Sequence, residues 1–258
     1  MRVLILAGGL GTRISEETSD KPKPMVSING KPILAHLMEI FSQQGFYEFV
    51  IALGYRGDVV KRWIKELNDL EGNIFVDTSK KLIVQIDDKQ KVNWKITALE
   101  TGLNTQTGGR IKKSMSHFPN ERLIVTYGDG LANVNITKLI EFHKSHGKLA
   151  TVTAVRPPAR FGYLKFSEES LVEHFGEKNQ LDEGWINGGF FILEPGVENY
   201  ITNDSEPFET GAILKLVKDK QLMSFRHDGF WQPMDTLRER NELERLSKLT
   251  IPPWLEVN

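Results

Sequence analysis

The sequence predicts an α/β fold, a mostly parallel, Rossmann-like sheet flanked by helices, with a smaller β-rich part. Two observations lead to this prediction. Short, wholly apolar segments alternate with amphipathic segments along the first half of the chain, an order typical of parallel strands joined by crossover helices. In the second half, several short strand-like segments follow one another with less helix between them.

The first half contains the strands of the expected parallel core. Residues 3–7 are apolar without alternation, as in a strand whose two faces are both covered. We expect strands at residues 3–7, 49–53, 123–127 and 150–155, and crossover helices at residues 32–44, 58–67 and 136–146. The first helix shows the reasoning, because Pro32 suits an initial turn, apolar residues recur on one stripe, and Gly45 can end the helix. Residues 82–86 and 92–99 are further candidate strands in a looser region.

The second half shows shorter elements and no break between domains. We expect strands at residues 162–166, 171–175, 188–193 and 222–226, and helices at residues 207–218 and 237–248. Neither an internal repeat nor a low-complexity linker interrupts the chain, so residues 1–258 are predicted to form one domain. Residues 251–255 are apolar but contain two prolines, and they are expected to pack on this domain or on another subunit.

Composition excludes several classes of protein. The formal net charge of −1 argues against a nucleic-acid partner held by bulk electrostatics. The chain has no cysteine, which excludes disulfides and thiolate metal sites. No apolar run approaches the roughly 18 residues of a membrane span, and glycines interrupt the apolar N-terminal stretch where a signal peptide needs its hydrophobic region. A cytoplasmic protein without a membrane segment is therefore expected.

The first predicted strand leads straight into a glycine-rich turn that ends in arginine, Leu6-Ala7-Gly8-Gly9-Leu10-Gly11-Thr12-Arg13. Glycine allows the backbone to approach a ligand closely, and the exposed N–H groups of such a turn form a concave anion site. Arg13, and Lys23 a little further on, add full positive charges. A polyphosphate is the natural ligand, so the turn predicts a nucleotide-binding protein.

Two common phosphate-binding loops do not fit this turn. A Walker A loop ends in Lys-Ser or Lys-Thr, whereas Thr12 and Arg13 stand here. A dinucleotide loop needs a third glycine where this chain has Ile14, and a helix after it, whereas residues 16–24 are predicted to be extended and broken by prolines. An ordinary glycine turn is the alternative for the loop alone, and the basic residues within 21–23 count against it.

The turn, together with the segment Lys21-Pro22-Lys23-Pro24-Met25, resembles the signature of the sugar-phosphate nucleotidyltransferases. These enzymes join a nucleoside triphosphate to a sugar 1-phosphate and release pyrophosphate. Further segments, in the family's order, resemble its cytidylyl-transferring members: Thr101-Gly102, Thr105, Thr107-Gly108-Gly109-Arg110, Tyr127-Gly128-Asp129-Gly130, Asn187-Gly188-Gly189-Phe190-Phe191 and residues 225–236. The resemblance implies the nucleotidyltransferase fold, CTP as one substrate and a sugar 1-phosphate as the other. Among sugar 1-phosphates it favours glucose 1-phosphate.

The resemblance divides the predicted domain into a nucleotide-binding part, about residues 1–135, and an acceptor-binding and C-terminal part, about residues 136–258. It also implies a homo-oligomer. The implied nucleotide-binding residues are Leu6, Ala7, Gly8, Gly9, Gly11, Thr12, Arg13, Lys23, Thr105, Gly109, Arg110 and Gly128. Two adjacent glycines would let a flat base lie against backbone, and Thr105, Gly109 and Arg110 would form hydrogen bonds with its edge. A flexible surface loop is the alternative for this segment.

Two aspartates are the candidate ligands of Mg²⁺, the implied cofactor. Asp129 follows a buried strand and stands between two glycines, at the sheet edge where ligands of open α/β sheets gather. Mg²⁺ takes one or two protein carboxylates together with substrate oxygens, and the resemblance assigns Asp129 and Asp235 to it. The alternatives are a plain turn aspartate for Asp129 and a helix N-cap for Asp235. His143 and His146 share a polar helix with no third ligand nearby, so no metal is expected there.

The implied reaction is an in-line displacement at the α-phosphorus of the triphosphate. Positioning and charge neutralisation dominate such chemistry, and the attacking phosphate is already ionised, so no general base is expected. Arg13, Lys23 and Asp129 are the implied catalytic residues. Arg13 would bind the triphosphate and help the leaving group, and Lys23, stiffened by its flanking prolines, would neutralise charge near the α-phosphate.

The acceptor side carries a second set of implied residues, Lys178, Asn187 and Gly188. Here the chain departs from the family pattern at four positions: Gly176, Asn179, Gly211 and Ala212. These departures bear on the acceptor more than on CTP. Two alternatives are therefore kept: a cytidylyltransferase for another phosphorylated small molecule, sugar or not, and a nucleotide-binding regulatory subunit that has lost catalysis.

Overall fold

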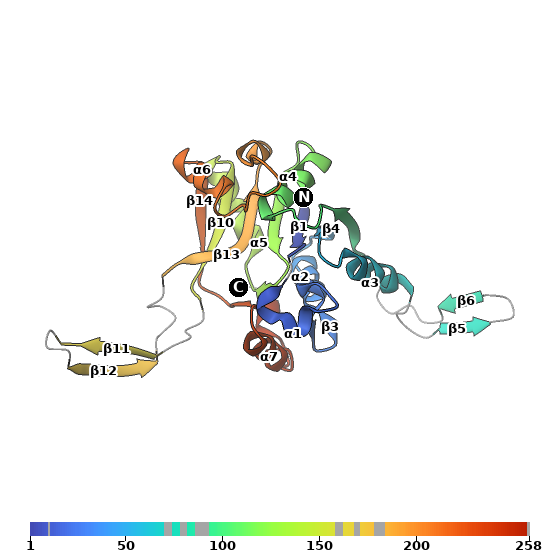
Figure 1. Ribbon diagram of the computed structural model, residues 1–258, viewed down its shortest axis with the longest axis horizontal. Coiled ribbons are helices and arrows are strands. Elements are labelled where there is room, and N and C mark those ends of the chain that lie inside the picture. The colour runs from blue at the N-terminus through green and yellow to red at the C-terminus, as the bar shows by residue number, and fades with distance from the viewer. Residues whose placement is uncertain are drawn as a thin grey trace.

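The computed structural model describes residues 1–9, 11–69, 74–77, 82–85, 93–157, 162–167, 171–177 and 184–256. Its centre is one seven-stranded sheet (Figure 1). The strands follow in the spatial order β14 (Leu222–His227), β10 (Ala150–Val155), β13 (Ile186–Leu193), β8 (Leu123–Tyr127), β1 (Arg2–Ala7), β4 (Glu48–Leu53) and β7 (Lys95–Glu100). Neighbours are parallel except that β13 runs antiparallel to both β10 and β8. The predicted mostly parallel sheet is therefore confirmed.

The register places the ends of the three central strands at one edge. Leu6 of β1 lies beside Ala52 of β4 and Tyr127 of β8. Because the three strands are parallel, the loops that follow them start from the same edge of the sheet. The glycine-rich turn after β1 and the segment that contains Asp129 after β8 are thereby brought together.

Helices cover both faces of the sheet, which explains why the central strand β1 is apolar from Val3 to Ala7. Alternate residues of β1 belong to two separate clusters, with Val3 and Ile5 on one face and Leu4 and Leu6 on the other. The first face packs against α2 (Ile33–Ser42) and α5 (Ile136–His146), and the second against α4 (Thr107–His117) and α6 (Ala212–Lys218).

The remaining helices are α1 (Ser15–Thr18), α3 (Gly57–Asp69) and α7 (Leu237–Leu246), with short 3₁₀ turns at η1 (Thr12–Ile14), η2 (Lys23–Met25), η4 (Val197–Tyr200) and η5 (Pro253–Leu255).

The prediction that residues 16–24 are extended is wrong in part, because α1 and η2 overlap this segment. Gly11 adopts a left-handed conformation with φ of 65°, and the Thr18 hydroxyl donates hydrogen bonds to the carbonyls of Gly11 and Ile14. These bonds close a compact helical turn where the prolines alone predicted open chain.

Within the described ranges, four two-stranded sheets accompany the main sheet: β2 (Ser27–Ile28) with β3 (Lys31–Pro32), β5 (Ile74–Asp77) with β6 (Leu82–Gln85), β9 (Gly130–Ala132) with β15 (Trp231–Pro233), and β11 (Gly162–Phe166) with β12 (Val172–Glu177). The hairpins β5–β6 and β11–β12 extend from opposite sides of the body in Figure 1. The pairing of β9 with β15 matters most for the site, because it joins the middle of the chain to its C-terminal part.

The apolar C-terminal segment packs on the domain itself, one of the two predicted alternatives. Trp254 of η5 is fully buried. Its ring lies 6.0 Å from that of Phe230 and 5.6 Å from that of His36, measured between ring centroids. The segment thus closes the core beneath α2.

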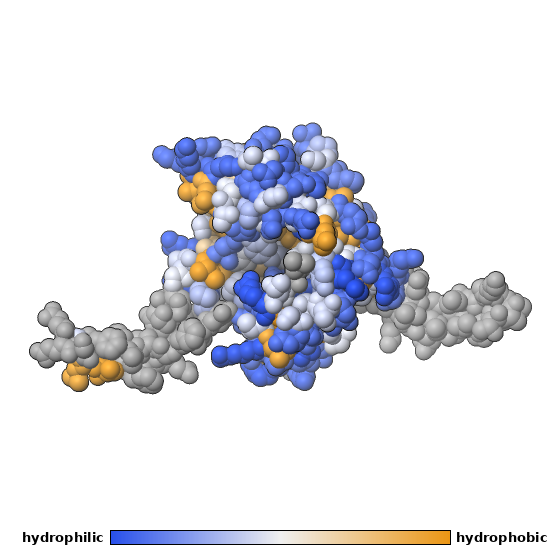
Figure 2. Space-filling model, in the orientation of Figure 1, coloured by the Kyte–Doolittle hydropathy of each residue, from blue (hydrophilic) through white to orange (hydrophobic). Residues whose placement is uncertain are grey.

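The hydropathy of the surface indicates what the body of the protein can contact. On the face shown in Figure 2 the body is mostly hydrophilic, and its hydrophobic spots are small and separate. Such scattered spots are normal for a folded domain. In the described part of the chain, no helix combines the length and hydropathy that crossing a bilayer requires.

Candidate active site

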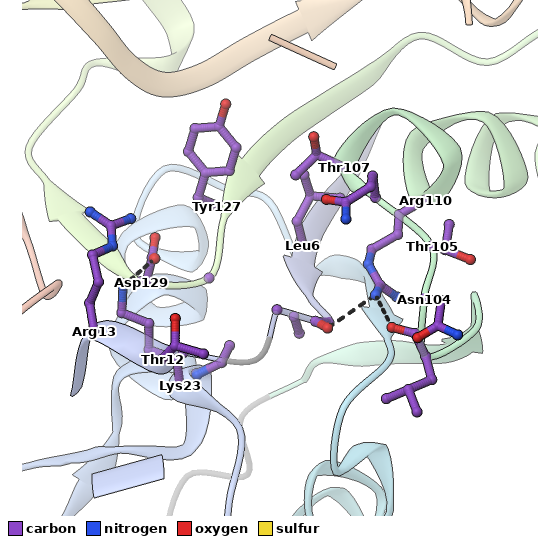
Figure 3. A pocket seen from close by; sticks show the side chains of 18 residues that line it. Leu6, Thr12, Arg13, Lys23, Asn104, Thr105, Thr107, Arg110, Tyr127 and Asp129 are labelled. Carbon is purple, nitrogen blue, oxygen red and sulfur yellow. Dashed lines mark hydrogen bonds and ion pairs between the residues drawn. The ribbon is translucent and has the colours of Figure 1, made fainter. Parts of the chain in front are cut away.

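A cavity of about 500 Å³ lies at the edge where β1 and β8 end. All the predicted nucleotide-binding residues except Gly109 line it, namely Leu6, Ala7, Gly8, Gly9, Gly11, Thr12, Arg13, Lys23, Thr105, Arg110 and Gly128, together with Asp129. Figure 3 shows that the charged groups Arg13, Lys23 and Asp129 gather at one side of the cavity and Thr105 and Arg110 at the other. The cavity therefore has a charged end and an end formed largely by neutral polar groups.

Arg110 is built into the floor of the cavity. Its guanidinium donates hydrogen bonds to the carbonyl of Gly8 (3.0 Å), the carbonyl of Leu53 (2.8 Å) and the hydroxyl of Thr101 (2.5 Å). These partners belong to the ends of β1 and β4 and the residue after β7, so one side chain ties three strand ends together. Only 4% of Arg110 is exposed, and this burial lowers the pKa of its guanidinium.

Gly8 must be glycine because of this contact. A Cβ atom at position 8 would lie 2.1 Å from Cζ of Arg110, which no pair of non-bonded carbon atoms tolerates. At the next position, Gly9, a Cβ would meet nothing within 4 Å. The first glycine of the turn thus makes room for Arg110, and the second leaves open space above the backbone.

The alternative of a flexible surface loop at residues 105–110 does not hold, because α4 begins at Thr107. A Cβ at Gly108 would lie 2.5 Å from the carbonyl oxygen of Glu206, and one at Gly109 would lie 2.6 Å from that of Asp204. The two glycines therefore let the first turn of α4 pack tightly against another segment, and they do not offer backbone for a base to lie on. Two glycines at a helix start have low helix propensity, which is why the sequence did not indicate a helix there.

The two predicted metal ligands are brought together by the pairing of β9 with β15. Gly130 pairs with Pro233 in this small sheet, and the N–H of Met234 donates to the carbonyl of Asp129 at 2.8 Å. Asp129 and Asp235 flank these pairs in the sequence. Lys23 lies between them, with its Nζ 2.7 Å from Oδ2 of Asp129 and 2.5 Å from Oδ1 of Asp235.

Arg13 joins the same cluster, since its Nη1 lies 2.9 Å from Oδ2 of Asp235. Burial by itself lowers the pKa of Lys23, but the charges and hydrogen bonds of Asp129 and Asp235 outweigh it and raise that pKa above its ordinary value. Lys23 is therefore protonated at neutral pH. The cluster holds two positive and two negative groups at the charged end of the cavity.

Asp235 is not the N-cap of α7, which was the alternative role for it. The N-cap is Thr236, whose hydroxyl accepts from the N–H of Glu239 in a capping box. The Glu239 carboxylate in turn accepts from the N–H groups of Asp235 (2.7 Å) and Thr236 (2.9 Å). This arrangement fixes the backbone of Asp235 and leaves both of its side-chain oxygens directed at cations.

The donor set fits a divalent ion such as Mg²⁺. A single ammonium nitrogen touches both carboxylates, so oxygens of Asp129 and Asp235 can reach one cation. Carboxylate oxygens are ligands that Mg²⁺ prefers, and it keeps other positions for water and substrate phosphates. Among the described residues there is no group of three or more His, Cys, Asp or Glu side chains that could hold a metal.

Of the predicted acceptor residues, Asn187 and Gly188 lie at the start of β13, and Lys178 lies outside the described residues, as does Asn179. The Nδ2 of Asn187 donates to the Tyr127 hydroxyl at 3.1 Å. Gly188 is buried, and its carbonyl accepts from Nε1 of Trp231 at 2.9 Å. Gly188 thus supports the site through its backbone.

Tyr127 and Glu209 were not among the predicted site residues, but they bond to each other beside Asn187. The Tyr127 hydroxyl donates to Oε1 of Glu209, and the Thr107 hydroxyl donates to Oε2 of Glu209 at 2.8 Å. Burial raises the pKa of Tyr127, and the nearby Glu209 charge raises it further, so the phenol stays protonated. No local pattern connects Tyr127 with Glu209, because only the packing of α4 and of the segment before α6 against β8 brings them together.

Comparison with known proteins agrees with this geometry. Residues 2–238 match the family model of the nucleotidyl transferases. The chain belongs to the nucleotidyl transferase family. It is 43% identical over 261 residues to the glucose-1-phosphate cytidylyltransferase of Salmonella typhi, and the match covers 98% of each protein. It is also 40% identical over 247 residues to the probable glucose-1-phosphate cytidylyltransferase of Bacillus subtilis, covering 95% of this chain and 96% of the relative.

Solved structures show the same fold. HddC from Yersinia pseudotuberculosis, in complex with GMP-PN, superposes with a TM-score of 0.68 at 25% identity, covering 96% of this chain and 99% of HddC. The resemblance to sugar-phosphate nucleotidyltransferases that the motifs indicated is thus confirmed across nearly the whole chain. The protein is a nucleotidyltransferase, and the cavity at the ends of β1 and β8 is its candidate active site.

Proposed function

We propose that this protein is a Mg²⁺-dependent cytidylyltransferase that joins CTP to a sugar 1-phosphate and yields a CDP-sugar and pyrophosphate. Glucose 1-phosphate is the favoured acceptor. The observation that carries the proposal is the cluster of Arg13, Lys23, Asp129 and Asp235 at one end of a cavity floored by the glycine turn. The similarity to glucose-1-phosphate cytidylyltransferases supports the choice of CTP and of the sugar.

The geometry supports distinct roles for the two ends of the cavity. Backbone N–H groups of the glycine turn and the exposed guanidinium of Arg13 bind the triphosphate at the charged end. The base lies at the other end, near Thr105 and the buried guanidinium of Arg110. Most of the Arg110 N–H groups are already bonded to protein carbonyls and to Thr101, so Arg110 acts there largely by fixing the loops around the base.

Asp129 and Asp235 would hold Mg²⁺, which when bound neutralises the phosphates and orients the α-phosphate for attack. Lys23, which keeps its proton, adds a second positive charge beside the same phosphorus. An oxygen of the sugar phosphate attacks the α-phosphorus, a new P–O bond forms, and the bond to the pyrophosphate oxygen breaks. The attacking phosphate is already ionised, so no side chain needs to accept a proton in this step.

The proposal also covers the two parts of the chain, the cellular compartment and the oligomeric state. Residues 1–135 bind the nucleotide, and residues 136–258 bind the acceptor through Lys178, Asn187 and Gly188 and also supply Asp235. A protein that consumes CTP and a sugar phosphate works where both are made, so we assign it to the cytoplasm and expect neither nucleic acid nor membrane as a partner. We also propose that it forms a homo-oligomer, as the resemblance implies.

A pyrophosphate-release assay tests the proposal. The protein is incubated with Mg²⁺, each of the four common nucleoside triphosphates in turn, and a panel of phosphorylated acceptors that includes glucose 1-phosphate. We expect release with CTP and a sugar 1-phosphate. Release with CTP and only a non-glucose acceptor would favour a cytidylyltransferase for another phosphorylated small molecule, and no release with any pair would favour a regulatory nucleotide-binding subunit.

A further inference from the structure

Tyr55 holds the chain on both sides of Arg13. Its backbone N–H donates to the carbonyl of Gly8 at 3.3 Å, where the glycine turn leaves β1. Its phenol oxygen lies 3.2 Å from the carbonyl oxygen of Thr18 and 3.1 Å from that of Ser19, so its O–H donates at the end of α1. One residue therefore contacts the chain both before and after the arginine that lines the charged end of the cavity.

Residues 11–19, the η1–α1 segment, form a compact unit that needs support from outside. They consist of η1 and the single-turn helix α1. So short a helix cannot bond its own last carbonyls, and the phenol of Tyr55 is a donor to them. Within the segment, the Thr18 hydroxyl bonds to the carbonyls of Gly11 and Ile14, and Ile14 is fully buried. The segment is thus held to the body by a buried side chain and by the phenol.

The turn that carries Tyr55 has an unusual backbone conformation. It spans residues 54–57, directly after β4. Arg56 in this turn has a φ of 50°, a left-handed conformation that residues other than glycine seldom adopt. Arg110 packs against the turn, since a Cβ at Gly54 would lie 2.5 Å from Nη2 of Arg110. Such a conformation persists where the surrounding packing enforces it, so the fold fixes the direction in which Tyr55 points.

The η1–α1 segment supplies part of the cavity at the ends of β1 and β8, the nucleotide cavity. Gly11, Thr12 and Arg13 line it, and Nη1 of Arg13 lies 2.9 Å from Oδ2 of Asp235. The Arg13 side chain is 74% exposed, so the backbone of its segment decides where the guanidinium can reach. Tyr55 is outside the set of described residues that line the cavity. Any effect of Tyr55 on a bound nucleotide must therefore pass through this segment.

We propose that Tyr55 is a positioning residue for triphosphate binding: its phenol holds the η1–α1 segment so that Arg13 is in place before the nucleotide arrives. This inference rests on the proposed function and deepens it, because it gives a residue outside the cavity a part in binding CTP. A group that is already in place needs no ordering when the ligand binds. Without the phenol bond, part of the binding free energy of the triphosphate is used to order the segment. The loss therefore falls on CTP binding and not on the chemical step.

The first test compares the kinetics of Tyr55→Phe, which removes only the phenol oxygen, with those of the wild type. KM for CTP should rise by roughly three- to tenfold, the usual effect of one lost hydrogen bond. The value of kcat should change by less than about twofold, because a bound triphosphate itself holds Arg13 in place. KM for the sugar phosphate should also change by less than about twofold, since the phenol contacts only the η1–α1 segment.

Tyr47→Phe is the matched control. Tyr47 lies just before β4, at the opposite end of that strand from Tyr55, and is 46% exposed. The same chemical change at this position should leave every constant unchanged.

Two measurements separate the positioning of Arg13 from a general loosening of the fold. In calorimetry, Tyr55→Phe should weaken the binding of CTP by roughly three- to tenfold. It should leave the binding of CMP, which lacks the two outer phosphates, within about twofold of the wild type. In an Arg13→Met background, adding Tyr55→Phe should alter kcat/KM for CTP by less than about twofold, because its effect passes through Arg13.

Amide hydrogen exchange tests the contact without any nucleotide. Amides of residues 11–19 should exchange faster in Tyr55→Phe than in the wild type and in Tyr47→Phe, and those of β1 should not change. Unchanged exchange in Tyr55→Phe, equal weakening of CTP and CMP, or an undiminished effect in the Arg13→Met background overturns the inference. A Tyr55→Phe protein that does not fold also overturns it, because the phenol would then serve the fold as a whole. If the wild type releases no pyrophosphate from CTP and any acceptor, the proposed function is wrong, whereas hydrogen exchange still decides whether Tyr55 holds the segment.

Discussion

Two cavities meet at Tyr127 but are built in different ways. Tyr127 lines the nucleotide cavity and bonds to Asn187 and Glu209, which line a second cavity of about 310 Å³. The nucleotide cavity is formed largely by backbone and by ion pairs, with the turn after β1 as its floor and Lys23 between two carboxylates. The second cavity has apolar walls, the indole of Trp185 held by two arginines, and neutral or singly charged hydrogen-bonding groups. The first cavity thus gathers paired charges, whereas the second has apolar walls with a few hydrogen-bonding groups.

The largest effect should come from the charged cavity. Asp129→Asn removes one of the two acids that would hold Mg²⁺, so turnover should fall to background. The fold should survive, because Asp129 contacts its surroundings mainly through its backbone carbonyl and Lys23. Pyrophosphate release measures the first expectation, and a thermal melt checks the second. Normal turnover in the variant would refute the assignment of Asp129.

Lys23→Met should lower kcat by roughly 100-fold, since it removes a positive charge placed beside the reacting phosphate. It also leaves Asp129 and Asp235 facing each other without the ammonium that bridges them. The free energy of unfolding of the variant should therefore rise more on addition of Mg²⁺ than that of the wild type. Chemical denaturation with and without Mg²⁺ measures this difference, and an identical Mg²⁺ response in both proteins would count against the shared cation site.

A pair of glycine variants separates the floor of the cavity from its open side. Gly8→Ala places a methyl group against Arg110, so stability should fall by about 1–3 kcal/mol and KM for CTP should rise. Gly9→Ala places the same group in open space and should leave stability within about 0.5 kcal/mol of the wild type. Denaturant titration and CTP kinetics measure both. Equal effects at the two positions would mean that Arg110 does not hold the turn as described.

The parts of the fold and of the candidate site that could be predicted are those whose cause lies within a short segment of the sequence. The strands, the glycine turn and the cations Arg13 and Lys23 follow from short segments, because apolar runs and glycine spacing act within a few residues. The start of α4 was missed, since the two glycines that weaken the helix locally are required by a segment about a hundred positions away. Glu209 was missed for the same reason. Its partners Tyr127 and Thr107 are defined only by the fold.

The environment of the histidines of α5 also depends on contacts that only the fold defines. Their titration leads to the smallest expected effect, a change of stability with pH. They were predicted to lie on a polar face, but His143 is buried, with Nδ1 2.8 Å from the Thr151 hydroxyl and Nε2 3.0 Å from Glu194. Burial lowers the pKa of His143 below its ordinary value of 6.5, and Glu194 opposes the shift only in part. The unfolded chain therefore binds a proton at higher pH than the folded chain does. Stability should be constant at higher pH and should fall as the pH drops below about 6.5.

Denaturant titration at several pH values measures this fall, and His143→Asn should reduce the slope. Arg122, which precedes β8, also contacts Glu194, so the cluster lies at the end of β8 opposite to Tyr127. The pH dependence of kcat between pH 6.5 and 8 should therefore be the same in wild type and variant. A stability that increases on acidification would show that His143 gains its proton on folding.

The most direct test of the charged cavity is the binding of CTP to wild-type protein, measured by calorimetry with and without Mg²⁺. If Asp129, Asp235 and Lys23 form one site for a cation and a triphosphate, CTP should bind with one site per chain and considerably more tightly in the presence of Mg²⁺. Asp235→Asn should remove most of that Mg²⁺ dependence. Binding of CTP that is indifferent to Mg²⁺, or no binding at all, would contradict the account.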